Sequence, residues 1–326
     1  MTQIEADVLV IGAGVSGLTT AVCLAQTGLR VVVYAAAPPQ RTTSAVAGAI
    51  WGPHLVGMDE RVTGWARLTL ATLGEMADSP AAGIQLLNGI DAYQTARQDP
   101  PSWTDGVGPR LRCQTVDLPA GYASGWHFTA PVITMPTYLD YLLEVFVRAG
   151  GRLYIDRTFA SLTAAADQSA ARVIVNCSGI GAHDLVPDAA VMPVRGQVIV
   201  AVNPGISNFF IGHGSAPDDV AYLFPHGQTV ILGGTQTARN WSLEPDPDTA
   251  ARILRTCAAI EPRLRGSAVL RHRVGLRPVR PQVRLEAEEI GDGRCVVHNY
   301  GHGGAGVTLS WGCALDVTQR VVRHLG

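Results

Sequence analysis

The chain has 326 residues, more than one ordinary hydrophobic core serves, so we expect either one large α/β domain or two domains. Its residues are 47% hydrophobic and 16% charged, a composition typical of a compact globular protein. The formal net charge of −2 provides no basic field for a phosphate backbone, so nucleic acid is not an expected partner. All basic residues are arginine, which excludes a Schiff-base lysine, a pyridoxal-phosphate lysine and a P-loop lysine.

Cysteine spacing and apolar segments give further expectations. The six cysteines lie far apart, with no C-x-x-C and no His/Cys group at zinc spacing, so we expect reduced, buried thiols and no metal site. The uncharged stretch from Val8 to Leu29 is long enough to suggest a membrane span, but Gly12, Gly14 and Gly17 favour a strand, a turn and a buried helix. No secretory signal is recognised at the start, so we expect a cytoplasmic protein that does not bind membranes.

The segment from residue 7 to residue 34 has the pattern of a dinucleotide-binding βαβ unit. An apolar run at 7–11 predicts a strand, G-x-G-x-x-G follows at 12–17, and apolar residues at helical spacing lead to a second apolar strand at 29–34. Gly12 would allow a tight turn, Gly14 a close approach of the backbone to a pyrophosphate, and Gly17 close packing of helix on strand. The helix N-terminus would offer unpaired N–H groups to the phosphates.

The second strand of this unit lacks one expected feature. An acidic residue that binds the ribose hydroxyls should stand roughly 20 residues beyond the glycines. The sequence there reads Tyr34-Ala35-Ala36-Ala37, so it does not indicate how an adenosine ribose would be held.

The remaining elements are predicted from hydrophobic periodicity. A helix is expected over 136–147, a buried parallel strand over 172–177, and antiparallel strands over 191–202, 206–212 and 228–234. Near the end, residues 301–306 contain four glycines and lead into a helix with one apolar face. No internal repeat or low-complexity linker separates these parts, so we expect two regions that are interleaved along the chain.

Three segments resemble signatures of the D-amino-acid oxidase family. They are Arg41–Trp51 (RTTSAVAGAIW), Gly275–Glu286 (GLRPVRPQVRLE) and His298–Thr308 (HNYGHGGAGVT), with lesser matches at Asn176–Gly179, Arg195–Gln197 and Leu232–Thr235. These matches follow the family order from residue 7 to about residue 316. The resemblance implies an α/β fold in which a Rossmann-type, doubly wound FAD-binding domain is interleaved with a substrate domain built on a mixed or antiparallel sheet.

The same resemblance implies the domain limits and the chemistry. We expect the FAD-binding domain at 1–52, 131–190 and 285–326, and the substrate domain at 53–130 and 191–284. The implied activity is that of an FAD-dependent oxidase. It converts D-amino acids to 2-oxo acids, ammonia and hydrogen peroxide, with hydride transfer from the substrate Cα to flavin N5. The expected partners are an amino-acid substrate and oxygen, and a homodimer is a further expectation.

Site residues are carried over from the family motifs. Arg277 is expected to bind the substrate carboxylate with its fork of donors, while Arg280 should point to the opposite side. Tyr222 would donate to the same carboxylate, and the Gly304 carbonyl would accept from the substrate amine. The implied cofactor contacts are Gly12, Ala13, Gly14, Val15, Ser16, Gly17, Arg41, Thr42, Thr43, Ser44, Gly48, Ala49, Ile50, Gly303, Gly304, Ala305, Gly306, Val307 and Thr308. His302 is not expected to be a base, because hydride transfer from a neutral amine needs none.

The substrate class is narrowed but not fixed. D-aspartate oxidases place an arginine just after the Leu-Gly-Gly-Thr segment, and here that residue is Gln236, which favours neutral side chains. Asp218 replaces a lid tyrosine, so a shorter lid is expected. Three alternatives stay open: a glycine, sarcosine or cyclic imino-acid oxidase, an NAD(P)-dependent dehydrogenase, and a non-catalytic FAD-binding protein. The sequence does not name the preferred amino acid, the oligomeric state or the physiological electron acceptor.

Overall fold

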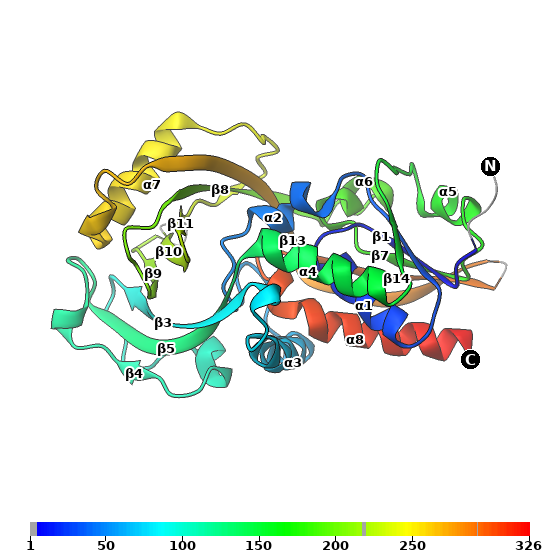
Figure 1. Cartoon of the computed structure of the whole chain (residues 1–326), viewed down its shortest axis with the longest axis horizontal. Coiled ribbons are helices and arrows are strands. Elements are labelled where there is room, and N and C mark those ends of the chain that lie inside the picture. Colours follow the sequence, from blue (N-terminus) through cyan, green and yellow to red (C-terminus); the bar gives the residue numbers. More distant parts are fainter. Residues whose placement is uncertain (1–4, 217–219, 292) are drawn as a thin grey trace.

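A computed structural model describes residues 5–216, 220–291 and 293–326, and shows two lobes joined by one mixed sheet (Figure 1). Within these residues the sheet has 14 strands. One lobe contains five strands that pair with one another in parallel. Their order is β6 (Arg152–Tyr154), β2 (Val31–Tyr34), β1 (Val8–Ile11), β7 (Val173–Asn176) and β14 (Arg294–His302). The first described strand, β1, and the C-terminal end of the chain both lie at this lobe.

The parallel strands are apolar on both faces because helices cover both faces. Val8 and Val10 face one core together with residues of α1 (Val15–Gln26), α4 (Met135–Arg148) and α8 (Gly306–Leu325). Their neighbours Leu9 and Ile11 point the other way, into a core shared with α5 (Leu162–Asp167). Side chains alternate across a strand, so continuous apolar runs mark a sheet buried on both sides. This is the doubly wound arrangement that the sequence predicts.

The other lobe is mainly antiparallel. Its strands run in the order β8 (Met192–Val202), β11 (Thr229–Gly233), β10 (Val220–His226), β9 (Phe209–His213), β3 (Ile84–Tyr93), β5 (Ser124–Ile133) and β4 (Leu111–Arg112), and β12 (Thr237–Ala238) pairs with β8. Only the β3–β9 pairing is parallel among these strands of the described chain. The helix α7 (Pro247–Ile260) packs Ile253 and Cys257 against its core.

The two lobes are connected by the long strand β13 (Val269–Gly291). Its first half pairs with β8 and its second half with β14, so it belongs to both lobes. Arg277 lies near the middle of this strand, between the two halves. The boundary expected between residues 284 and 285 therefore falls within one continuous strand.

Three short or peripheral helices complete the described structure. The helix α2 (Thr43–Val46) lies next to β13, α3 (Glu60–Met76) packs on α8, and α6 (Ala182–Leu185) follows β7. At Gly312 of α8 an added Cβ would collide with the Trp65 backbone of α3, so the α3–α8 contact is close.

Most of the expected elements are confirmed. The strands expected over 7–11, 172–177, 191–202 and 228–234, and the helix expected over 136–147, match observed elements within two residues. The strand expected over 206–212 begins later, at Phe209, because Asn203 accepts the Gly205 and Ile206 N–H groups in a tight turn. All six cysteines are buried and unpaired, as predicted. Among the described residues, no helix is long and apolar enough to cross a bilayer.

Candidate active site

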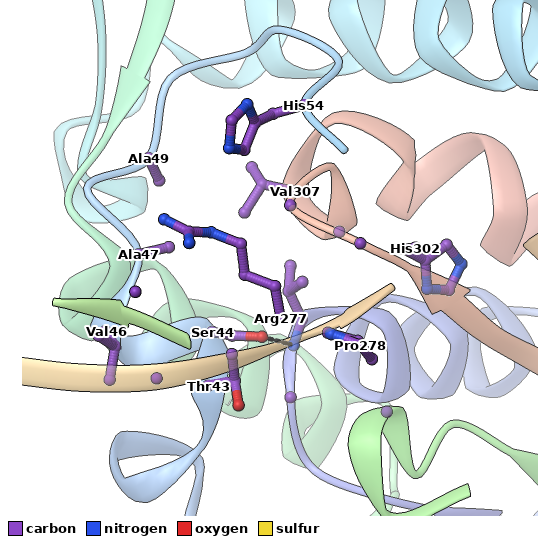
Figure 2. Close-up of a pocket in the computed structure, with 18 of the residues that line it drawn as sticks. Thr43, Ser44, Val46, Ala47, Ala49, His54, Arg277, Pro278, His302 and Val307 are labelled. Carbon is purple, nitrogen blue, oxygen red and sulfur yellow. Dashed lines mark hydrogen bonds between the residues drawn. The ribbon is translucent and has the colours of Figure 1, made fainter. Parts of the chain in front are cut away.

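A cavity of about 490 Å³ lies where the two lobes meet. Its wall is built from several segments of both lobes. They are the 12–16 turn, the residues that follow β2, β7 and β11, parts of the 41–54 segment, parts of β8, β9 and β10, β13 near Arg277, and parts of the 302–307 turn. Figure 2 shows Arg277 and His54 pointing into this space from opposite sides. The cavity therefore joins the expected dinucleotide loop to the expected substrate residues.

The glycine turn at the head of α1 has the predicted geometry. Gly12 has φ +108°, and a Cβ there would collide with the carbonyl of Cys177, the residue that follows β7. A Cβ on Gly17 would collide with the Gly12 carbonyl, so this glycine allows the close helix–strand contact assigned to it. The Val15 N–H of the first helical turn donates to Ser44 Oγ at 3.0 Å, which fixes the 43–46 segment beside the turn (Figure 2).

The cavity wall is electropositive. None of the described residues that line the cavity is Asp or Glu, whereas Arg41 and Arg277 both line it. Neither guanidinium has a carboxylate within ion-pair distance in the described part of the chain. Backbone N–H groups at a helix N-terminus and unpaired guanidinium groups suit a diphosphate and a carboxylate. This donor set and the glycine cradle fit FAD.

The wall near the expected ribose position is apolar. Ala35, Ala36 and Ala37 line the cavity, and Arg41 is the charged residue closest to them along the chain. No carboxylate among the described lining residues replaces the missing acid. The described wall therefore offers no carboxylate for the usual bond to a ribose hydroxyl.

Arg277 extends from β13 into the cavity. Its Nη1 donates to the Thr235 carbonyl at 2.9 Å, and the guanidinium occupies space that a side chain at Gly196 would need. Arg280, three residues later, instead forms an ion pair with Asp188, with Nε 3.0 Å from Oδ2. The structure thus separates the two arginines as the alternation along the strand predicts.

Tyr222 of β10 lies beside Arg277 of β13 within the same sheet. Its ring stacks on Phe224 with centroids 4.7 Å apart, and glycines at 233 and 234 leave room for it. Burial raises the pKa of Tyr222, and the nearby Arg277 only partly opposes this. The phenol therefore stays protonated at physiological pH and can donate a hydrogen bond.

The glycine turn before α8 is held by hydrogen bonds to Pro278 and His54. The Gly303 N–H donates to the Pro278 carbonyl at 2.9 Å, and the Gly304 N–H donates to the His54 carbonyl at 2.9 Å. A Cβ on Gly304 would stand 2.5 Å from His54 Cδ2. The turn therefore requires glycine where the family motif has it, and Gly304 faces the cavity.

Most of the expected cofactor residues line the cavity, but three do not. Gly17 packs behind the turn, and Ala305 is fully buried. Thr308 is also buried, and its Oγ1 donates to the Gly52 carbonyl at 2.9 Å and accepts from the Gly52 N–H at 3.1 Å. The Thr308 hydroxyl therefore fixes the backbone at Gly52 in this structure, and the cofactor contact expected of Thr308 stays a prediction.

Two histidines of the C-terminal motif are held by protein groups. His302 Nε2 lies 3.1 Å from Asn299 Oδ1 and its Nδ1 lies 3.5 Å from Ser16 Oγ. Burial lowers the pKa of His302 to about 4, so it is neutral at physiological pH. His298 contacts Asn176 and Glu288 instead.

Outside the residues that line the cavity, Glu289, Cys295 and His324 each bring one potential metal-ligand atom to within 4.8 Å of the other two.

Sequence reasoning missed several wall residues of the substrate end. Trp103, Ile211 and His213 line the cavity and come from segments without a recognised motif. Side chains alternate along β9, so Ile211 and His213 lie on one face of the strand. That face can be assigned to the cavity only when the pairing of β9 with β10 is known. Asp218, on which the shorter-lid expectation depends, lies outside the described residues.

Comparisons with known proteins agree with this geometry. A family model described as "FAD dependent oxidoreductase" matches residues 7–320. The D-amino-acid oxidase of Rubrobacter xylanophilus is 46% identical, with 96% of this chain and 94% of the relative covered. The D-amino-acid oxidase of Streptomyces coelicolor is 43% identical, with coverages of 97% and 96%.

A solved structure shows the same fold at low identity. The glycine oxidase of Bacillus cereus superposes with a TM-score of 0.80 at 16% identity, covering 98% of this chain and 95% of that one. Together with the full-length family match, this similarity extends over both lobes and the cavity between them. The chain belongs to the family of FAD-dependent oxidoreductases that includes the D-amino-acid oxidases.

Proposed function

We propose that this protein is a D-amino-acid oxidase, which converts D-amino acids to 2-oxo acids, ammonia and hydrogen peroxide. The observation that carries the proposal is the Arg277 guanidinium, which enters the cavity beside Tyr222 without a carboxylate partner in the described chain. An unpaired guanidinium in a partly buried cavity is suited to bidentate binding of a carboxylate. The relatives that are 43–46% identical are named D-amino-acid oxidases.

The residues of the chain bind and orient the substrate. Arg277 would hold the α-carboxylate, and the protonated Tyr222 hydroxyl would donate to the same group. The Gly304 carbonyl, in the turn that lies against His54, would accept a hydrogen bond from the substrate amine. FAD, when bound, supplies the acceptor for the hydride that leaves the substrate Cα. Residues 12–16 and 41–44 would hold its diphosphate.

The wall of the cavity also supports the preference for neutral side chains. Ile211, Phe224 and Trp103 provide apolar surface at the substrate end, and Gln236 stands where D-aspartate oxidases carry an arginine. His54 is kept neutral, because burial, Arg277 and His213 together lower its pKa to about 3. A small or medium neutral side chain would therefore meet no charge at His54.

The proposal is tested by the spectrum and the turnover of the purified protein. We expect flavin absorbance that D-alanine bleaches without oxygen, and hydrogen peroxide release with D-amino acids but not with L-amino acids. Arg277→Ala should keep the flavin spectrum and raise the KM for D-alanine by roughly 100-fold, since a charge-assisted contact is lost. Faster oxidation of glycine than of every D-amino acid would favour the glycine-oxidase alternative.

A further inference from the structure

A cluster of metal-binding side chains lies outside the cavity, at one end of the lobe that contains the parallel strands. Glu289 of β13, Cys295 of β14 and His324 of α8 each bring one ligand atom to within 4.8 Å of the other two. Within this set, His324 Nδ1 lies 3.4 Å from Glu289 Oε1. An oxygen, a sulfur and a nitrogen donor from three elements therefore meet at one point.

We propose that Glu289, Cys295 and His324 form a binding site for one zinc ion. The inference does not depend on the proposed function, because none of these three residues lines the cavity. The sequence predicts no metal site, since its cysteines and histidines show no zinc spacing. The three ligands are brought together by the fold instead.

Two lengths place the cluster far from the cavity. β14 reaches the cavity at His302, seven residues beyond Cys295, which is about 23 Å along an extended strand. α8 starts at Gly306 beside the cavity, and His324 lies 18 residues further on, about 27 Å along the helix. Figure 1 shows the C-terminal end of α8 at the end of this lobe that faces away from the other lobe. Zinc at this site would therefore be separated from anything bound in the cavity.

Strand pairing and helix packing explain why the three side chains converge. Glu289 and Cys295 are direct partners in the antiparallel β13–β14 pair, so their side chains share one face of the sheet. The helix α8 packs on these strands, and Cys295 shares a core cluster with Val317 and Val321. His324 follows Val321 by three residues, so both lie on one face of the helix. The site is thus held by the same packing that buries α8 on the sheet.

The ligand set is one that zinc prefers. Thiolate sulfur, imidazole nitrogen and carboxylate oxygen are its ordinary ligands in proteins, at bond lengths of about 2.0–2.3 Å. In a tetrahedron, these bonds place the ligand atoms roughly 3.3–3.8 Å apart. The three atoms of the cluster, all within 4.8 Å, need to approach one another by at most about 1.5 Å. Calcium and magnesium prefer oxygen ligands, so a thiol and an imidazole do not suit them.

The charges around the cluster favour a cation. The last carbonyl groups of α8 carry partial negative charge, and His324 lies in the last turn of that helix. Glu289 adds a carboxylate. Arg294, next to Cys295 on β14, lies 3.8 Å from the Asp167 carboxylate instead. Arg323, the other basic residue of the last turn, is exposed to solvent, where its charge is screened.

Burial gives the site an inner and an outer side. Cys295 is 2% exposed, whereas the side chains of His324 and Glu289 are 19% and 69% exposed. Zinc would enter past the carboxylate and reach the thiol, which binds as the thiolate and gives its proton to the solvent. The contact between Glu289 and His324 would be replaced by one bond from each residue to the ion. Three protein ligands leave the fourth position to water.

The experiment uses the FAD-loaded protein, freed of metal with a chelator that is then removed. Titration calorimetry with Zn²⁺ should give one ion per chain. With free zinc at about 100 times its Kd, the thermal midpoint should rise by roughly 3–5 °C, because only the folded chain joins the β13–β14 hairpin to the end of α8. Mg²⁺ at the same concentration should raise it by less than about 1 °C.

Cobalt tests whether the cysteine is a ligand. Co²⁺ accepts the same donors as zinc, and its bond to a thiolate adds a charge-transfer absorption that is read as a difference from the flavin spectrum. This absorption should appear in the wild type and be lost in Cys295→Ser. If Cys295→Ser does not fold, the two variants of the outer ligands carry the test.

These variants change side chains at the surface of the site. His324→Gln should weaken zinc binding by more than roughly 100-fold, since even a partner that only orients a ligand is worth about 10–100-fold. Glu289→Gln should weaken it by roughly tenfold or more. His272→Gln on β13 and Glu75→Gln on α3, both at exposed positions, are the matched controls and should bind zinc as the wild type does.

Three results would overturn the inference. The first is a wild type that binds no zinc, and the second is a cobalt complex without thiolate absorption. The third is a zinc affinity that is the same in the wild type, His324→Gln and Glu289→Gln. Zinc held by the histidines of the cavity would give this third result, and it would also compete with the substrate.

Discussion

Gly196 of β8 leaves the space that the Arg277 guanidinium occupies. A Cβ atom at Gly196 would stand 2.5 Å from Nη1 of Arg277, closer than non-bonded atoms approach. Gly275 of β13 lies directly opposite Gly196, and Arg277 is two residues further along on the same face. The position of the candidate carboxylate-binding group therefore depends on the absence of a side chain on the neighbouring strand.

Gly196→Ala should displace the Arg277 guanidinium. We expect the KM for D-alanine to rise about tenfold, since one charge-assisted hydrogen bond is weakened, while the flavin spectrum is kept. Steady-state kinetics and the visible spectrum measure the two effects. Gly64→Ala is the control, because an added Cβ at Gly64 of α3 meets nothing within 4 Å. An unchanged KM in Gly196→Ala would contradict the role given to this space.

Arg41→Ala should weaken FAD binding. Arg41 lines the cavity beside Thr42 and Thr43, in a wall without a described carboxylate. Loss of this guanidinium should raise the Kd of FAD by roughly tenfold, the scale of one hydrogen bond to a charged group. Titration of the apoprotein with FAD, followed by flavin fluorescence, measures the change. Arg255→Ala, at an exposed position on α7, should bind FAD as the wild type does.

Asp188 should contribute a stability that depends on pH. Desolvation would raise the pKa of its carboxyl, but hydrogen bonds from Tyr300 and Arg280 outweigh it, so the pKa lies below the ordinary value of 3.8. A carboxyl with a depressed pKa stabilises the folded state above the unfolded pKa, and this stability is lost as pH falls through the folded pKa.

Asp188→Asn tests this expectation. At pH 7 the variant should lose about 1–3 kcal/mol of unfolding free energy, because the contacts with Arg280 and Tyr300 lose their charge. The difference between variant and wild type should shrink as pH falls below 3.8. Urea unfolding at several pH values measures it, and an equal difference at pH 7 and pH 3 would contradict the prediction.

Several features of the fold and the site could be predicted from local sequence. The βαβ unit at 7–34 is encoded by its own apolar runs and glycines, because each of those residues acts on its immediate neighbours. The opposite directions of Arg277 and Arg280 also follow from strand alternation, and the structure confirms them with separate partners. The buried state of the six cysteines is predicted by their type and spacing.

Other features had no local signal. The Thr308 hydroxyl, assigned to the cofactor by the family motif alone, is bound to Gly52, a residue 256 positions away. Asp91 and His213 are separated by 122 positions, and neither lies in a recognisable motif. Their contact exists because β3 pairs in parallel with β9.

The sequence by itself determined the doubly wound half of the fold, the glycine turns and the identity of the arginine that enters the cavity. Only the tertiary structure decided that Trp103, Ile211 and His213 line the cavity, and that the Thr308 hydroxyl is bound to Gly52. The physical reason is that strand and helix patterns depend on neighbours along the chain. Contacts such as Asp91–His213 depend instead on which distant strands pair, and many residues set that pairing jointly.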